Sequence, residues 1–344
     1  MKNNSDIFWS YLKTYFSVYL PRQRNCSPHT IMACKDTWNL FLRYLFQEKG
    51  VNSSKITMDD ITSASVMDFL DHMSESRGWT PSTRNHRLSC IRSFFDYVAC
   101  QEPALYVYAA GLKSIPACKK SHRDMIEYMS REAMKTLLGT PDPETRNGLR
   151  DQFFMSLMYD TAARDCEMLA MRLSDYNENS LTVYLMGKGA KPRLVPVSAE
   201  TTSLFIRYKK RLHPENAGGD PMFYTIHKQM KTEMSDDNVA RFIKKYADAA
   251  RKENPDIPDR VHPHMFRKSR AMHLYQAGMD LPMLSEFLGH EDPQTTLIYA
   301  RADVEMKRTA ICKATENSTA IHPDAEKPVW EDNTDIITRL CRGY

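Results

Sequence analysis

Two histidines, an arginine and a tyrosine in the C-terminal half of the chain fall at the ends of expected helical segments. His264 and Arg267 are three positions apart, so on one helix they share a face and can both reach a small anion. His290 follows a glycine that stops a short helix, and Tyr299 comes nine positions later on a short, separable element. Side chains at helix ends can converge on a ligand, so we predict that these four groups form a site.

Two other signals belong with this group. Arg164 and Glu167 lie one helical turn apart, where a carboxylate can orient an arginine. Lys188 stands between two glycines, in a turn that joins expected strands at 181–186 and 193–197. The glycines permit positive φ angles and hold the lysine at an exposed tip, free to reach a neighbouring ligand.

Each of these signals also has an ordinary interpretation. A His-x-x-Arg pair is common on helices, Arg164 with Glu167 could be a simple surface ion pair, and a hairpin lysine can serve solubility alone. His262 or His264 could be a metal ligand, but no cysteine or carboxylate accompanies them at ligand spacing. The order and spacing of the whole set therefore decide the interpretation.

The elements that must position the site are mostly helices. Apolar periodicity and capping residues predict them at the following places: a short helix capped by Ser130, an apolar helix from Asn147 to Tyr159, and helices at 201–213, 235–252, from Arg267 to a glycine cap at Gly278, at 281–288 and at 301–315.

The first hundred residues predict a separate domain of four helices. The first, 6–20, ends at Pro21; the second begins at Ser27-Pro28 and the fourth at Thr80-Pro81, both with a capping residue followed by proline. The third spans 64–76. Basic side chains lie away from the apolar stripes of these helices, and Arg241 lies outward on a later one. Such residues could neutralise DNA phosphates or could simply be solvated; they are His29, Lys35, Arg84, Arg87, Arg92 and Arg241.

Helix-breaking residues divide the chain. Residues 101–125 contain Pro103, Gly111 and Pro116, which is typical of a linker. We predict a helical DNA-binding domain at 1–105, a linker at 106–125, a catalytic domain at 126–315 and a tail at 316–344. A short apolar helix in the tail could fold back in cis or dock on a neighbouring subunit.

Composition narrows the class of protein. The 344 residues suffice for two domains, 42% of them are apolar, and no apolar run could span a bilayer. With no apolar leader at the start, we expect a cytoplasmic protein. The eight cysteines never approach Cys-x-x-Cys spacing, which argues against a zinc finger. The net charge is only +4, but residues 1–120 hold 15 Lys and Arg against 10 Asp and Glu.

Taken in order, six residues resemble the active site of the tyrosine recombinases, the phage-integrase and Xer-type family: Arg164, Lys188, His264, Arg267, His290 and Tyr299. The resemblance extends through the whole expected catalytic domain. It departs from the family at Ala162, where glycine is usual, and at Lys268, where histidine is common.

The resemblance implies a fold and a chemistry. The fold is mainly α with a small antiparallel β-sheet: a helical, SAM-like core-binding domain followed by an α+β catalytic domain. Tyr299 would attack a phosphodiester to give a 3′-phosphotyrosyl bond, and Lys188 would protonate the leaving 5′-oxygen. The remaining roles would be the phosphate clamp (Arg164 and Arg267), proton transfer at the tyrosine (His264), a hydrogen bond to phosphate (His290) and support of the site (Glu167). Because the covalent intermediate conserves the bond energy, no ATP, metal or other cofactor is expected.

The implied partners are double-stranded DNA carrying specific recombination sites and further copies of the chain, as a tetramer on two sites, with no membrane. The implied role is integration or excision of a mobile element, or a related exchange. Two alternatives stay open: a type IB topoisomerase that religates the same strand, and a non-catalytic DNA-binding protein of the same fold. The second would be expected to lack the tyrosine or an arginine, and this chain has both.

Overall fold

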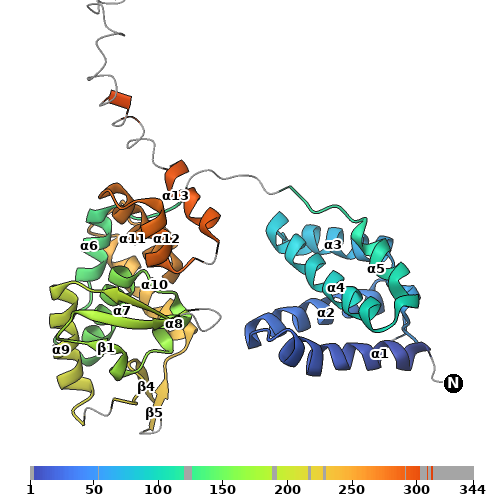
Figure 1. The fold of residues 1–344 in the computed structure, drawn as a ribbon, viewed down its shortest axis with the longest axis horizontal. Coiled ribbons are helices and arrows are strands. Elements are labelled where there is room, and N and C mark those ends of the chain that lie inside the picture. The colour runs from blue at the N-terminus through green and yellow to red at the C-terminus, as the bar shows by residue number, and fades with distance from the viewer. Residues whose placement is uncertain are drawn as a thin grey trace, which may run out of the picture. The chain divides into compact units, whose positions relative to one another are not determined.

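A computed structural model describes residues 4–52, 54–119, 126–187, 192–215, 218–227, 230–290, 292–302, 308 and 311–312. The chain divides into two compact units, residues 1–122 and 123–344 (Figure 1). Each unit has its own hydrophobic core. Lys188 and the tail from 316 onward lie outside the described residues, as does most of the helix expected at 301–315.

The first unit is entirely helical in its described part. Its elements are α1 (Asn4–Thr14), a π-helical segment (Tyr15–Gln23), α2 (Pro28–Gln47), a 3-10 turn (Met58–Asp60), α3 (Ser63–Arg77), α4 (Pro81–Gln101), a second 3-10 turn (Pro103–Leu105) and α5 (Tyr106–Lys113). The cap-then-proline signals are confirmed, because Ser27 accepts a hydrogen bond from the Thr30 amide and Thr80 from that of Thr83.

Two expectations for this unit are wrong. The first helix does not end at Pro21, because the π-helical segment runs through it to Gln23. The wider π turn accommodates a residue that lacks an amide hydrogen. The expected linker also begins too early: Tyr106–Lys113 is helix α5, and its Ala109 and Leu112, with Ile115 beyond it, are buried in the first core. Arg92 explains the attachment, since its guanidinium donates to the carbonyls of Leu112, Lys113 and Ile115.

The second unit combines helices with two small antiparallel sheets. Its helices are α6 (Arg131–Gly139), α7 (Arg146–Thr161), α8 (Asp165–Leu169), α9 (Ala199–Leu212), α10 (Asp236–Ala250), α11 (Pro263–Gln276), α12 (Leu281–Leu288) and α13 (Leu297–Ala302). Its strands are β1 (Tyr176–Asn177), β2 (Thr182–Met186), β3 (Pro192–Pro196), β4 (Tyr224–His227) and β5 (Met230–Glu233). The mainly helical fold class with a small antiparallel sheet is therefore confirmed.

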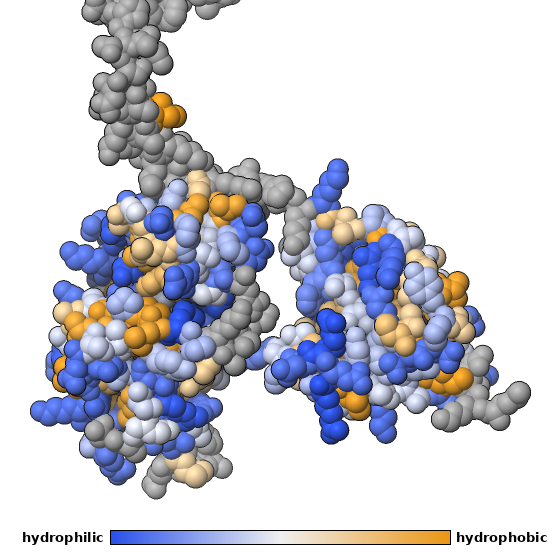
Figure 2. Space-filling model, viewed as in Figure 1, coloured by the Kyte–Doolittle hydropathy of each residue, from blue (hydrophilic) through white to orange (hydrophobic). Residues whose placement is uncertain are grey.

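The two expected strands, β2 and β3, pair antiparallel with Tyr184 opposite Leu194, and β1 adds a short third strand. Val183, Leu185 and Val195 face the core, whereas Tyr184, Met186 and Leu194 are exposed. Figure 2 shows apolar surface over this sheet. The β4–β5 hairpin is an element that the sequence did not predict.

Helix α7 runs through the core of the second unit and packs against α9 and α11. Its Phe153, Phe154, Leu157 and Met158 are fully buried. Burial of this apolar surface stabilises the fold by about 25 cal/mol per Å² and so holds α7 in place. The end of α7 is therefore fixed, and with it the start of the segment that carries Arg164. Within the described part of the chain, no helix has both the length and the apolar character needed to cross a membrane.

Candidate active site

Four chain segments bring four of the six predicted catalytic residues to one groove and place a fifth, the buried Arg267, behind it. Arg164 caps the start of α8, His264 and Arg267 lie in the first turns of α11, His290 follows the end of α12, and Tyr299 lies on α13. The groove has a volume of about 1240 Å³. Its polar lining comprises Arg164, Arg193, His264, His290 and Tyr299, together with Ser285, Glu286, Asp292 and Thr295.

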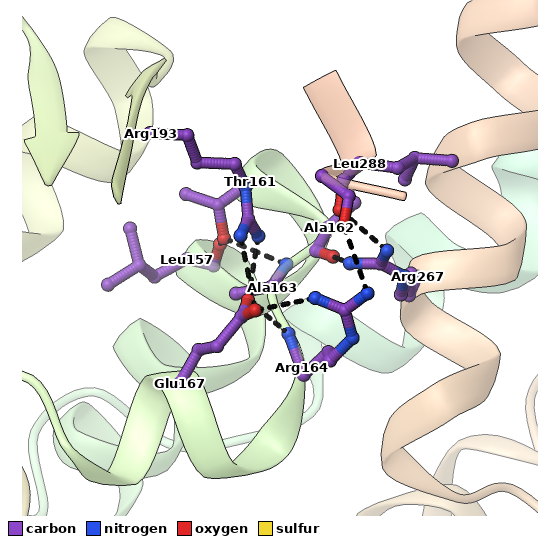
Figure 3. A network of polar contacts seen from close by, with 10 residues as sticks. Leu157, Thr161, Ala162, Ala163, Arg164, Glu167, Arg193, Arg267 and Leu288 are labelled. Carbon is purple, nitrogen blue, oxygen red and sulfur yellow. Dashed lines mark hydrogen bonds and ion pairs between the residues drawn. The ribbon is translucent and has the colours of Figure 1, made fainter. Parts of the chain in front are cut away.

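Arg267 is held from two sides by backbone carbonyls. One terminal nitrogen donates to the carbonyl of Ala162 at 2.7 Å and the other to that of Leu288 at 2.6 Å (Figure 3). The side chain is 2% exposed. Burial, followed by the charge of Arg164, lowers its pKa to about 10, so it stays charged at neutral pH. The guanidinium therefore joins the turn before α8 to the end of α12.

Arg164 is held by a buried carboxylate. Its Nη1 donates to Glu167 Oε1 at 2.7 Å, its backbone amide donates to Oε2 at 3.0 Å, and its Nη2 donates to the Gly289 carbonyl at 3.2 Å (Figure 3). The Arg164 side chain keeps 31% of its surface exposed, whereas that of Glu167 keeps 2%. The carboxylate thus aims a guanidinium that is still open to a ligand.

Arg193 is a site residue that the sequence reasoning missed. It lies on β3, and both of its terminal nitrogens donate to Glu167, Nη1 to Oε1 at 3.1 Å and Nη2 to Oε2 at 2.6 Å. The signal available in the sequence was an arginine at a core-facing position of an alternating strand, where a charge needs a partner.

Ala162 ends α7 with a φ of 48°, in the left-handed region that favours glycine. It is fully buried, and its carbonyl is one of the two that hold Arg267. Glycine adopts this backbone without strain, so alanine at this position carries backbone strain that its buried methyl group helps to offset.

We expect Ala162→Gly to change the free energy of unfolding by less than about 1 kcal/mol. Relief of about 1–2 kcal/mol of left-handed strain is offset by the lost buried methyl, about 0.8 kcal/mol, and by the greater backbone entropy of unfolded glycine. Ala162→Val should instead lower the free energy of unfolding by about 3 kcal/mol. A β-branched residue is strained at this positive φ, and its larger side chain overpacks a fully buried site. Urea unfolding of the full chain measures both, and a valine variant as stable as the parent would contradict the assignment.

Both site histidines are neutral at neutral pH, because their pKa values are lowered. Partial desolvation of its ring, then the charges of Lys268 and Arg267, lower the pKa of His264 below its ordinary value, although the side chain is exposed. Burial and the charge of Arg267 lower the pKa of His290 to about 4. A neutral imidazole can accept a proton through one nitrogen while it donates through the other.

Thr296, a second residue missed from sequence, is the hydrogen-bond partner of one ring nitrogen of His290. Its hydroxyl lies 2.8 Å from Nδ1 of His290, and the threonine is 1% exposed. If the hydroxyl donates, Nδ1 accepts and Nε2 carries the proton that can be donated to an anion.

We expect Thr296→Val to slow DNA cleavage about tenfold, which corresponds to one lost orienting hydrogen bond of about 1.4 kcal/mol. Thr296→Ser should restore the rate because it restores the hydroxyl. Single-turnover cleavage of a nicked duplex measures both variants. Equal rates for valine and serine would show that the hydroxyl does not orient His290.

Tyr299 is 2% exposed and packs with Ala271, Met272, Leu284 and Leu288 beside Ala162. Burial raises the pKa of its phenol, and the charge of Arg267 partly offsets the increase. The hydroxyl is therefore protonated at neutral pH and needs a proton acceptor before it can act as a nucleophile.

The basic residues predicted to bind DNA differ in their exposure and in whether other residues already occupy their side chains. His29, Lys35 and Arg241 are exposed, and Arg84 pairs with Asp71 at 3.0 Å. Arg87 and Arg92 require a correction, because they are not free on the outer helix face. Arg87 donates to the Ala33 carbonyl and the Thr37 hydroxyl, while Arg92 holds the end of α5. Among the described residues, no cluster of His, Cys, Asp or Glu could hold a metal ion.

Comparison with known proteins identifies two matched regions. Residues 127–306 match the phage integrase family, and residues 13–102 match the phage integrase N-terminal SAM-like domain. The chain is similar to y4rC of Sinorhizobium fredii, named as an integrase/recombinase, with 29% identity over 91% of this chain and 94% of that protein. It is 28% identical to the tyrosine recombinase XerC of Myxococcus xanthus, over 84% of this chain and 92% of that protein.

A solved structure has the same fold. The XerH site-specific recombinase, bound to palindromic difH substrate in a post-cleavage complex, superposes with a TM-score of 0.65 and 20% identity. The alignment covers 91% of this chain and 85% of that one.

Proposed function

Because the chain belongs to the phage integrase family of tyrosine recombinases, we propose that it cuts and rejoins DNA at specific sites with Tyr299 as the nucleophile. The observation that carries the proposal is the convergence of Arg164, His264, His290 and Tyr299 on one groove, with the buried Arg267 behind it. A phenol that shares a groove with one fixed guanidinium and interacts with a second, buried one suits attack on a phosphodiester.

In the proposed reaction the phenolic oxygen of Tyr299 forms a bond to phosphorus, and the bond from phosphorus to the 5′-oxygen breaks. The phenolic proton passes to the neutral His264, and Lys188 protonates the departing 5′-oxygen. The product is a 3′-phosphotyrosyl bond and a free 5′-hydroxyl. A 5′-hydroxyl from another duplex reverses the step and seals the exchange.

Arg164 and Arg267 would bind the two non-bridging oxygens, and His290 would donate a hydrogen bond to one of them. Charge accumulates on these oxygens as the pentavalent transition state forms, and donors that are already oriented stabilise it without reorganisation. The carbonyls and the carboxylate that hold the two guanidiniums provide this orientation.

We further propose that the enzyme binds double-stranded DNA through both units and acts as a tetramer on two sites. XerH is a recombinase of the same fold whose structure holds DNA. The exposed His29, Lys35 and Arg241, with the partly buried Arg84, are the proposed phosphate contacts. The tail at 316–344 is the proposed contact between subunits, in support of integration, excision or a related exchange.

A nicked duplex carrying the recombination site tests the proposal, because the nick releases a short strand and traps the covalent intermediate. We expect a protein–DNA adduct that survives detergent and whose modified peptide contains Tyr299. An adduct on another residue, or none despite tight binding, would refute it. Relaxation of supercoiled DNA that lacks a recombination site, without exchange between sites, would favour the topoisomerase alternative.

A further inference from the structure

Arg193 and Arg267 lie on opposite sides of Arg164 and Glu167 (Figure 3). The neighbours of Arg193 in β3, Pro192 and Leu194, are exposed, whereas the Arg193 side chain turns inward and keeps 11% of its surface exposed. Two nearly parallel hydrogen bonds join its guanidinium to Glu167, at 3.1 and 2.6 Å. This fork-to-fork geometry is one that lysine cannot reproduce.

Glu167 is shared between Arg193 and Arg164. Each carboxylate oxygen accepts one hydrogen bond from each arginine, which gives four in all. In the described part of the site, the guanidiniums of Arg164 and Arg193 pair with one carboxylate, and that of Arg267 lies near enough to interact with all three groups. The groove also carries Glu286 and Asp292, so the positive charge is concentrated around Glu167, where it suits the negative charge of a phosphorane.

Arg193 also lies against the turn that carries His290. Gly289 has a φ of +62°, and a Cβ placed on it would come within 3.2 Å of Arg193 Nη1 and 3.3 Å of its Cδ. The carbonyl of Gly289 accepts the hydrogen bond from Arg164 Nη2 at 3.2 Å. One side chain on β3 therefore contacts both supports of Arg164, the Glu167 carboxylate and the Gly289 turn.

We propose that Arg193 is a positioning residue for DNA cleavage, which acts through Glu167 to fix Arg164 and joins the β2–β3 hairpin to the start of α8. The inference rests on the proposed function. Arg193 need not touch the phosphate, because its contribution is the orientation of Arg164. In the sequence Lys188 falls between β2 and β3, so this ion pair ties the strand next to the proposed acid to the segment that bears a phosphate clamp.

The protonation of Glu167 gives a readout that a purely structural ion pair would not move. Burial raises the pKa of this carboxyl, but hydrogen bonds, the largest from Arg193, outweigh it and hold the pKa below its ordinary value. Without the hydrogen bonds from Arg193, burial is less fully offset, and the pKa of the Glu167 carboxyl rises. Burial also raises the pKa of the neighbouring Asp165 to about 6, so the parent enzyme has a pH response of its own. Cleavage by an Arg193 variant should decline more steeply than that of the parent as the pH is lowered from neutral, because a protonated Glu167 orients Arg164 less well.

The test measures single-turnover adduct formation on the nicked duplex for Arg193→Met and Arg193→Lys. We expect Arg193→Met to be about 100-fold slower and Arg193→Lys about tenfold slower, as for removal and weakening of a supporting contact. The methionine variant should show the added acidic decline. Arg172→Met is the matched control, because Arg172 forms an exposed ion pair with Glu233 on the same unit and should leave the rate unchanged.

Combination with Glu167→Gln completes the test. If Arg193 acts through Glu167, the double variant is no slower than Glu167→Gln alone, and the acidic decline disappears. Parental rates for both Arg193 variants, additive effects with Glu167→Gln, or a slowing fully matched by lost DNA affinity or lower melting temperature would overturn the proposal. Failure of the proposed function is separate, because the parent chain itself would then form no adduct on Tyr299.

Discussion

Tyr299→Phe is expected to abolish covalent attachment to DNA while leaving DNA affinity within about fivefold of the parent, since one neutral hydrogen bond contributes only about 0.5–1 kcal/mol. The change removes the single oxygen that would bond to phosphorus. It keeps the ring that packs among Met272, Leu284 and Leu288, so the fold of α13 should survive. Detergent-resistant adduct on the nicked duplex, together with a binding titration, measures the two effects separately.

Tyr275→Phe is the matched control for this variant. Tyr275 lies on α11 and packs against the same apolar cluster as Tyr299, but it does not line the groove. Its phenylalanine variant should form adduct at the parental rate. Persistence of the adduct in Tyr299→Phe would place the nucleophile elsewhere. Loss in both variants would point to disturbed packing rather than to lost chemistry.

The parts of the fold that the sequence predicted are those with local causes. Ser27-Pro28 and Thr80-Pro81 start helices through contacts within four residues, and Gly289 ends α12 with a left-handed φ. The three-residue spacing places His264 and Arg267 together in the first turns of α11. For these signals neither the neighbours in space nor the rest of the chain needs to be known.

The parts that escaped prediction depend on partners far along the chain. Arg193 meets Glu167 26 residues away, and Arg92 meets α5 20 or more residues away, so both resembled solvated charges. Helix α5 was not predicted, because it lies between Pro103 and Pro116 and contains a glycine, and these residues are typical of a linker. Strand β5 is exposed at every position and shows no alternation between buried and exposed residues. Whether a charged side chain is buried can be decided only when the position of its partner in the fold is known.

Arg267→Lys is expected to slow cleavage by about 100- to 1000-fold, the cost of removing one preorganised donor from a transition state. An ammonium is a point charge and cannot donate to the carbonyls of Ala162 and Leu288 while it also contacts a phosphate oxygen. Because those carbonyls are buried, the variant should also lose about 2–4 kcal/mol of unfolding free energy. Single-turnover cleavage and urea unfolding of the full chain measure the two losses.

Arg164→Lys separates the two losses. Arg164 remains 31% exposed, and water can replace part of its contacts, so we expect a similar loss of rate with a much smaller loss of stability. A parental cleavage rate in Arg267→Lys would show that Arg267 does not bind the phosphate. Equal destabilisation by the two variants would mean that burial does not distinguish the two arginines. The predicted difference follows from their supports, since one guanidinium is fixed by buried carbonyls and the other by a carboxylate that Arg193 shares.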